Sequence, residues 1–225
     1  MLKLNDKDIY IIKHFINEKS KILFLYSHDI ESLAKVQNIS NNNIDVFEYN
    51  IKDIEFMYQN NINVINGNIN IDLVNLKPKS YDFIIVNNVI TKSRFPLDFL
   101  KNVCKASKNV ILISNNIAHY SYRLKFFFYG SLFVKNNFDI PNITIEEPWY
   151  DQSPWRFSVK DIVNLCSNGG LRVAKGFYFD SSEDKILNIY DMRNYPNLYA
   201  KKVFYLITNE SFETTIPFSL SLKGI

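Results

Sequence analysis

Apolar segments of strand length alternate with helical patterns along the first half of the chain, and this alternation constrains the fold most strongly. The segments expected to be strands are residues 21–26, 44–49, 63–65, 82–87 and 109–114. Those expected to be helices are residues 7–18, 30–36, 52–58 and 95–106, the first capped by Asp6. Such alternation is typical of a mostly parallel sheet with helices on both faces, so we expect a Rossmann-like α/β fold.

Beyond residue 115 the chain departs from simple alternation. Residues 119–133 have a helical pattern and lead into a loop that contains several prolines. Ser158 is expected to cap a helix over residues 159–167, which Gly169 and Gly170 end. The last two expected strands, residues 171–179 and 201–208, have no evident helix between them. We therefore expect them to pair as an antiparallel hairpin at the sheet edge, with a long connection.

The composition indicates a single folded unit. The chain has 225 residues, of which 47% are hydrophobic and 22% charged, which is enough for one well-buried core. No segment resembles an interdomain linker. We therefore expect one domain over residues 1–225, in which residues 119–157 form a helical and loop insertion over the sheet edge. Residues 209–225 are expected to be a C-terminal tail.

The charge and hydropathy patterns argue against several classes of function. The net charge of +3 comes from lysines scattered along the chain, which favours a solvated surface over a nucleic-acid-binding one. No apolar run reaches about 18 residues, so we expect no membrane span. Asp6, Asp8 and Lys13 interrupt the N-terminus, which therefore does not resemble a signal peptide.

Cysteine and histidine positions give no metal-binding motif. Cys104 and Cys166 lie far apart within helical patterns, as expected for buried, reduced thiols of a cytoplasmic protein. His14, His28 and His119 are dispersed along the chain. We therefore predict that no metal is bound.

The loop after the first expected strand lacks the usual features of a nucleotide-binding site. The chain has no glycine before Gly67, and the strand runs into Tyr26, Ser27, His28 and Asp29. In Rossmann-type folds this loop normally carries several glycines, because a backbone without Cβ atoms can approach a cofactor closely. The scaffold is therefore recognisable, whereas the usual indication of cofactor binding is missing.

Six strings resemble, in the same order, those of one protein family. They are D8-I-Y-I-I-K-H-F-I-N-E-K-S-K-I-L-F-L25, N63-V-I-N-G-N-I-N70, Y81-D-F-I-I-V-N-N-V-I90, S114-N-N-I-A-H-Y120, W149-Y-D-Q-S-P-W-R156 and N194-Y-P-N-L-Y-A200. With these strings the chain resembles the MetW family, a branch of the class I S-adenosylmethionine (SAM) methyltransferases. The resemblance implies that family's fold, in which five parallel strands are completed by an antiparallel pair.

The MetW resemblance implies a cofactor loop of the form Asp-x-Gly-x-Gly-x-Gly, and this chain departs from it. At the four defining positions it has Phe24, Tyr26, His28 and Ile30. Side chains as large as Tyr and His would occupy the ligand volume or need to rotate away, and a non-glycine residue at positive φ adds strain of about 1 to 3 kcal/mol. We expect SAM binding to be weakened or lost, with binding by a divergent loop as the alternative.

Four residues are candidates for cofactor binding by the same resemblance. Glu48 matches the acid at the end of the second strand that accepts the ribose hydroxyls. Asn68 replaces the acid that contacts the adenine edge, a mild change because an amide oxygen still accepts a hydrogen bond. Ser27 and Asp29 lie in the loop itself. Asp29 can equally cap the following helix, and Glu48 can be an ordinary polar strand end.

Five residues are candidates for facing a crevice or a partner. Asn115 and His119 follow the fifth strand, where α/β folds place ligands, in a string that resembles the family's Ser-x-Asn-x-Gly-His-Trp. Trp149, Tyr150 and Asp151 lie in the proline-bounded loop, which can be a substrate lid or a packed cover. A lone histidine is more often structural, so a functional role for His119 depends on the family resemblance.

Residues 122–133 form an aromatic and basic stretch. We favour a helix buried against the sheet as its simplest interpretation. However, Phe126, Phe127, Phe128 and Tyr129 are consecutive and point around more than one face of a helix, so some aromatic surface should remain outside the core. Exposed aromatic surface beside basic residues suits a protein interface.

The MetW resemblance implies a role in methionine biosynthesis as the partner of a homoserine O-acyltransferase. No methyl acceptor follows from these residues. We therefore expect a methyltransferase-fold protein that acts mainly through a protein partner. The alternative is an active SAM-dependent methyltransferase.

Overall fold

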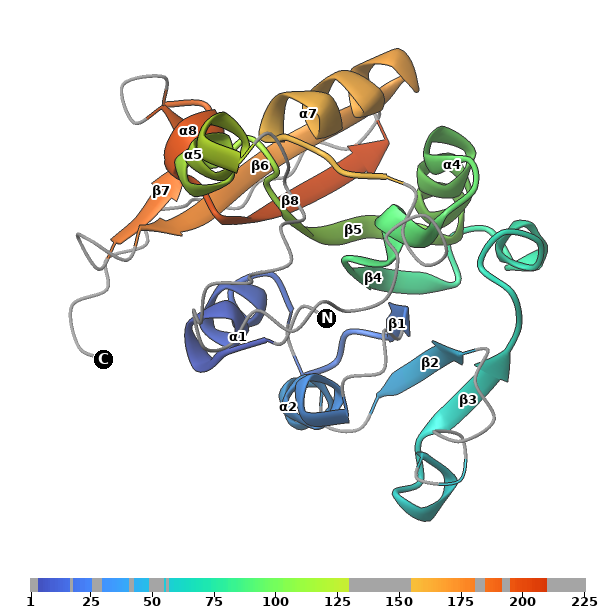
Figure 1. Ribbon diagram of the computed structural model, residues 1–225. Helices are drawn as coiled ribbons and strands as arrows, with labels where there is room; N and C mark the ends of the chain where they lie inside the picture. The colour runs from blue at the N-terminus through green and yellow to red at the C-terminus, as the bar shows by residue number, and fades with distance from the viewer. Residues whose placement is uncertain are drawn as a thin grey trace.

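The structure is a computed structural model of the chain. It describes residues 4–16, 18–25, 30–40, 43–48, 55, 57–129, 155–180, 185–191 and 195–209. Within these ranges the strands and helices form three layers, with helices on both faces of one sheet (Figure 1). The expected α/β class and Rossmann-like arrangement are confirmed.

The sheet has eight strands among the described residues, in the spatial order β3-β2-β1-β4-β5-β8-β6-β7. Their bounds are β1 Ile22–Leu25, β2 Ile44–Glu48, β3 Asn63–Asn66, β4 Tyr81–Asn87, β5 Ser107–Asn115, β6 Leu171–Asp180, β7 Lys185–Asn188 and β8 Lys202–Asn209. Strands β1 to β5 are parallel to one another, and β8 is antiparallel to both β5 and β6. The mostly parallel sheet with an antiparallel C-terminal edge agrees with the expectation.

The C-terminal edge contains one strand that the sequence did not suggest. Strands β6 and β8 pair as expected, and the connection between them contributes β7, which pairs antiparallel to β6 and forms the sheet edge. The short helix α8, Pro196–Tyr199, follows in the same connection. The final strands therefore form a three-stranded antiparallel extension in the order β8-β6-β7, in which β8 joins the extension to β5 and β6 is the middle strand.

Five helices of eight or more residues occur among the described residues, and four of them pack on the two faces of the sheet. Their bounds are α1 Asp6–Lys13, α2 Ile30–Ile39, α4 Pro96–Ala106, α5 Tyr120–Tyr129 and α7 Val159–Asn168, with two short 3-10 helices, η1 Leu73–Asn75 and η2 Val89–Lys92. Helices α4 and α7 pack in one core cluster, and α1 and α2 pack in the other (Figure 1). The helix expected at residues 52–58 falls mostly outside the described residues, although Glu55 and residues 57–59 are helical.

Alternating side chains of each central strand pack into the two cores on opposite faces of the sheet. In β4, for example, Ile84 and Val86 join the core beneath α4 and α7, whereas Phe83 and Ile85 join the core beneath α1 and α2. This alternation follows from the period of two in a strand, and a strand covered on both faces is apolar at every position. Consistent with this, all four residues of β1 are buried.

The helix ends follow the expected chemistry with one correction. Helix α1 is capped by Asn5, which accepts from the Asp8 backbone while the Asp8 carboxylate accepts from the Asn5 backbone. The expected cap at Asp6 was therefore wrong by one residue, and α1 ends at Lys13 rather than at residue 18. At α7 the expected Ser158 cap is confirmed, and Gly170 beyond the helix end has φ +67°.

Candidate ligand and partner site at the carboxyl edge of the sheet

The carboxyl ends of the five parallel strands lie along one edge of the sheet. The register aligns Leu25 of β1 with Phe47 of β2 on one side and with Val86 of β4 on the other. Because β1 has β2 on one side and β4 on the other, the connections diverge here, and α/β sheets bind ligands at such a switch point. Most of the candidate site residues follow these strand ends.

The β2–β3 part of this edge is closely packed around a glycine. Glu48 ends β2 in register with Asn66 of β3, which brings the expected ribose-binding position to the carboxyl edge. A Cβ atom added at Gly67 would lie 2.7 Å from Cζ of Phe47, so a side chain there would clash with that ring. The packing at Gly67 therefore favours a residue without a Cβ atom, whereas the loop after β1 has no glycine.

Asn68 lies beside this glycine and is engaged in local hydrogen bonds. Its backbone N–H donates to Oδ2 of Asp72 at 2.7 Å, and its side-chain oxygen accepts from the backbone N–H of Asn70 at 2.9 Å. In turn Oδ1 of Asn70 accepts from the Arg94 backbone at 2.7 Å. The Asn68 side-chain oxygen, which was expected to face adenine, thus already accepts a hydrogen bond within its own turn. An amide oxygen can still accept a second hydrogen bond.

The end of β4 contributes an asparagine in an uncommon conformation. Asn88 has φ +59° and begins η2, and its carbonyl accepts from both the backbone and the hydroxyl of Thr91. Its side-chain Oδ1 is buried without a hydrogen-bond partner among the described residues. Sequence reasoning did not single out Asn88, since the left-handed backbone that places it has no distinctive sequence signal beyond an asparagine.

Asn116 organises the turn after β5, next to the predicted crevice-facing residue Asn115. The Asn116 amide donates to the carbonyls of Asn197 and Ala200, at 3.1 and 2.7 Å, and its Oδ1 accepts from Ala118. Asn115 lies in β5 with an exposed side chain. The S114–Y120 string already contained the signal, because Asn116 is the residue that matches the asparagine of the family pattern.

His119 is brought to this edge and is buried at the start of α5. Its Nδ1 lies 2.7 Å from the Ser121 hydroxyl and 3.3 Å from the Ser121 backbone N–H, so Nδ1 accepts. Burial, together with the positive charge of Lys201, lowers the pKa of His119 below its ordinary value. The ring also lies against Tyr120, with centroids 4.4 Å apart. These contacts give His119 a role in beginning the helix, and its imidazole is neutral near pH 7.

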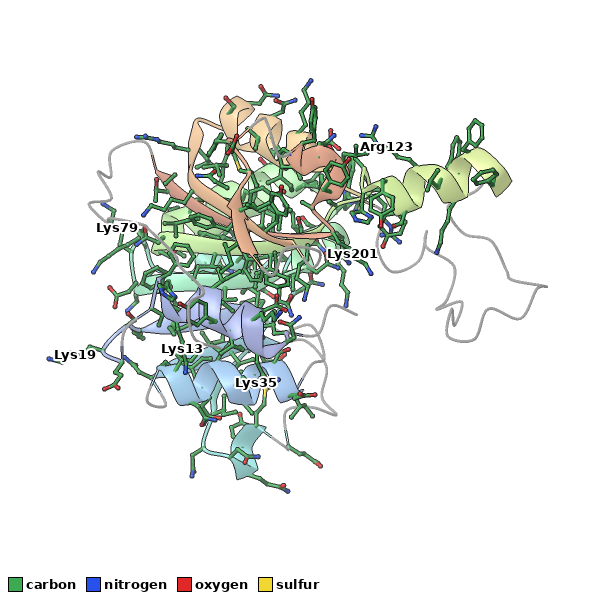
Figure 2. All side chains as sticks on the ribbon, turned by 90° about the vertical axis from the view of Figure 1, so that its left-hand side faces the viewer. Lys13, Lys19, Lys35, Lys79, Arg123 and Lys201 are labelled. Atoms are coloured by element: carbon green, nitrogen blue, oxygen red, sulfur yellow. The ribbon has the colours of Figure 1, made fainter. Side chains whose placement is uncertain are left out.

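Helix α5 exposes its aromatic side chains. Phe126, Phe127 and Phe128 are 58%, 80% and 70% exposed, and Leu124 is 49% exposed. None of the side chains described in α5 is buried. The interpretation as a helix buried against the sheet was therefore wrong, whereas the expected aromatic surface outside the core is present. Figure 2 shows α5 extending away from the sheet, with aromatic rings at its far end.

A surface pocket lies against the same helix. It has a volume of about 360 Å³ and is lined by Ile117, Tyr122, Arg123, Phe126 and Phe127. The Nε of Arg123 donates to the Ala118 carbonyl at 2.7 Å, which ties the helix to the turn before it. The pocket therefore lies between the turn after β5 and the exposed aromatic face of α5.

Five predicted site residues lie outside the described residues. They are Ser27, Asp29, Trp149, Tyr150 and Asp151. Nearby, the backbone N–H of Trp155 donates to the Thr91 carbonyl. The Trp155 ring stacks on that of Phe157, with ring centroids 6.3 Å apart. The hydrogen bond to Thr91 joins the segment before α7 to the turn after β4, at the same edge of the sheet.

In the part of the chain that the structure describes, no three His, Cys, Asp or Glu side chains form a group that could hold a metal ion. Cys104 and Cys166 are buried, as expected, and neither takes part in a disulfide. Burial raises the pKa of each thiol to about 12. For Cys104, the electrostatic interaction with Cys166 also raises the pKa. Both thiols are therefore protonated and unreactive near pH 7.

No helix within the described ranges is both long and apolar enough to cross a membrane.

A family profile matches almost the whole chain. The profile described as methionine biosynthesis protein MetW covers residues 6–207. The chain belongs to the MetW family. None of the curated protein sequences matches it.

Solved structures of methyltransferases resemble this member of the MetW family in fold. A SAM-dependent methyltransferase from Thermotoga maritima, described as a possible histamine N-methyltransferase, has 13% identity and a TM-score of 0.57, covering 92% of this chain and 95% of that one. A SAM-dependent methyltransferase from Aquifex aeolicus has 11% identity and a TM-score of 0.56, covering 92% and 100%. A SAM-dependent methyltransferase from Archaeoglobus fulgidus has 11% identity and a TM-score of 0.57, and the match covers 89% of this chain and 90% of that one. At such identities the likeness concerns the fold.

Proposed function

We propose that this MetW protein acts in methionine biosynthesis as the protein partner of a homoserine O-acyltransferase, with weak or no binding of SAM. The observation that carries the proposal is the match to the MetW family over residues 6–207. The exposed phenylalanines of α5 support a role in protein association, because aromatic residues are enriched in interfaces.

The residues at the carboxyl edge of the sheet favour weak or no binding of SAM. The loop after β1 has no glycine in its sequence, and Tyr26 and His28 stand where the family pattern has glycines. At the β3 end, the oxygen of Asn68 already accepts from Asn70. Glu48 remains at the end of β2. Two of the three positions that the family pattern assigns to the cofactor therefore differ from that pattern, and Glu48 retains the acid at the third.

Co-purification tests the partnership directly. The tagged full-length chain is expressed in its own organism, and bound proteins are analysed for the homoserine O-acyltransferase. We expect the acyltransferase to be retained by the wild type and by Glu48→Ala alike, because the partnership does not need the ribose contact. Loss of the acyltransferase from Glu48→Ala alone would favour a ligand-dependent association instead.

Thermal unfolding in the presence of SAM tests the cofactor. A ligand at a hundred times its dissociation constant stabilises a protein by about 2.7 kcal/mol, and each kcal/mol moves the Tm of a domain of this size by about 2–4 °C. We expect no measurable shift in millimolar SAM or its demethylated product. A rise of several degrees would instead support a SAM-dependent methyltransferase with a divergent loop.

A glycine-restoring variant locates the cause of weak binding. Replacing Tyr26 and His28 with glycine removes the two large side chains while Glu48 and Asn68 remain. We expect this double variant to bind SAM more tightly than the wild type, as measured by calorimetry. Without ligand it should be less stable by about 0.5–1 kcal/mol per glycine, because glycine increases the entropy of the unfolded chain. Unchanged affinity would show that the defect extends beyond these positions.

A further inference from the structure

The exposed apolar surface of α5 is large enough to form the centre of an interface. An aromatic side chain presents roughly 200 Å², so the exposed parts of Phe126, Phe127 and Phe128 together offer roughly 400 Å². One side of a standard protein interface buries about 800 Å². The three rings would thus provide about half of that area, a proportion that suits the buried core of an interface.

The shape of this surface favours an enclosing partner over a flat one. Consecutive residues of a helix are about 100° apart, so Phe126, Phe127 and Phe128 project from more than one side of α5. A helix that is apolar on several sides is normally surrounded by other apolar groups. Since α5 extends away from the sheet (Figure 2), its far end is accessible to a groove that receives a helix.

The charge of the same region indicates what the partner must carry. Arg123 and Lys125 lie on α5, and Lys201 lies close enough to His119 to lower its pKa. The sequence has no acidic residue between Asp98 and Asp139. A second copy of this helix would bring like charges together, which opposes a symmetric contact between two copies. An acidic rim would complement this surface.

We propose that α5 is a docking helix, which inserts into an apolar groove with an acidic rim on the partner protein. This inference rests on the proposed function, which makes that partner the homoserine O-acyltransferase. Phe127 and Phe128 are the anchors, and Arg123 and Lys125 pair with the rim. The pocket formed by Ile117, Tyr122, Arg123, Phe126 and Phe127 receives an apolar side chain from the wall of the groove.

Binding measurements with the full-length chain and the purified acyltransferase test this docking mode. The variants are the double variant Phe127→Ala with Phe128→Ala, the charge reversal Lys125→Glu, and Phe95→Ala as the matched control. Phe95 is 60% exposed and lies at the start of α4, where it contacts Arg94. Each variant is first shown to unfold at the Tm of the wild type.

We expect the double variant to bind at least about 30-fold more weakly, which corresponds to about 2 kcal/mol for a lost anchor. Lys125→Glu should lower the association rate constant and reduce its dependence on salt, because a charge at the rim steers the encounter. Phe95→Ala should bind like the wild type. Binding of the acyltransferase by all three variants with wild-type affinity would overturn the docking role of α5 and leave the proposed partnership intact.

A second copy of the chain or a lipid surface as the occupant of α5 would give results different from those expected for the acyltransferase. If the wild type does not bind the acyltransferase at all, the proposed function fails and the docking mode fails with it. Sedimentation that shows a wild-type dimer lost in the double variant would assign α5 to self-association and overturn the proposal. Binding to vesicles of phosphatidylcholine and phosphatidylglycerol that depends on Phe127 and Phe128 would overturn it in favour of a lipid surface.

Discussion

Helices α4 and α5 are similar in length and follow neighbouring strands of the sheet, yet only α4 joins the core. Helix α4 has 11 residues and follows β4, and α5 has 10 residues and follows β5. The residues that α4 buries are Pro96, Phe99, Leu100, Val103, Cys104 and Ala106. None of the described side chains of α5 is buried.

The difference lies in the spacing of the apolar residues. In α4 they recur every three or four positions, so they form one stripe that faces the sheet. In α5 the phenylalanines are consecutive, so no single face can bury them all against the sheet. Apolar content alone therefore does not place a helix in the core. A helix patterned like α4 stabilises the fold, whereas one patterned like α5 is suited to contact another molecule.

The largest effect on stability is expected in α4. Leu100 is fully buried in the core beneath α4 and α7, so Leu100→Ala should lower the free energy of unfolding by about 2–5 kcal/mol. Denaturant unfolding measures the loss. The matched variant Leu100→Met conserves volume and should cost less than about 1.5 kcal/mol. Equal losses for the two variants would show that volume at this position does not determine stability.

A smaller loss is expected where α5 is anchored. Asn116→Ala removes the side chain that bonds to the carbonyls of Asn197 and Ala200, so it should destabilise the chain by about 1–3 kcal/mol. The control Asn115→Ala replaces an exposed neighbour, so it should change the free energy of unfolding by no more than about 0.5 kcal/mol. Chemical unfolding of both variants gives the comparison, and a larger loss for Asn115→Ala would contradict the role of Asn116.

His119 should give this anchor a modest pH dependence. Burial, with Lys201 as a second cause, lowers the folded-state pKa of His119, so the unfolded chain takes up a proton first as pH falls. The stability that His119 contributes is complete above the unfolded pKa of about 6.5 and is lost as pH falls toward the folded value. Between pH 7.5 and 5.5 the wild type should therefore lose more stability than His119→Asn. An equal or greater loss in the variant would exclude this effect.

The smallest effect is expected at the far end of α5. Phe128 is 70% exposed, and its ring contact within the described residues is with the neighbouring Phe127. Phe128→Ala should therefore change the free energy of unfolding by less than about 0.5 kcal/mol. A loss comparable to that of Leu100→Ala would show that α5 packs as α4 does, and the contrast between the two helices would disappear.

The sequence predicted the parts of the fold that are determined by local pattern. Strands β1, β4 and β5 are continuous apolar runs, and their buried side chains leave few alternatives. Strand β7 was missed because it has only four residues at the sheet edge, where Ile186 and Leu187 are half-buried and no apolar run marks it. The cap of α1 was misplaced because Asn5 and Asp6 are both good capping residues.

The candidate site was less predictable because it depends on contacts between distant segments. The exposure of α5 was foreseen only in part, since consecutive phenylalanines do not show which of them the sheet will cover. Asn116 binds carbonyls more than 80 residues away in the sequence, and no local pattern predicts that contact. The use of the Asn68 oxygen within its own turn is likewise a feature of the folded backbone.

The most direct test of the central claim is a calorimetric titration of the full-length chain with the homoserine O-acyltransferase, with and without millimolar SAM. If the chain acts by docking through α5 and does not depend on a bound cofactor, the dissociation constant should be the same in both titrations. Association that occurs only when SAM is present would contradict this claim and assign the protein a SAM-dependent role.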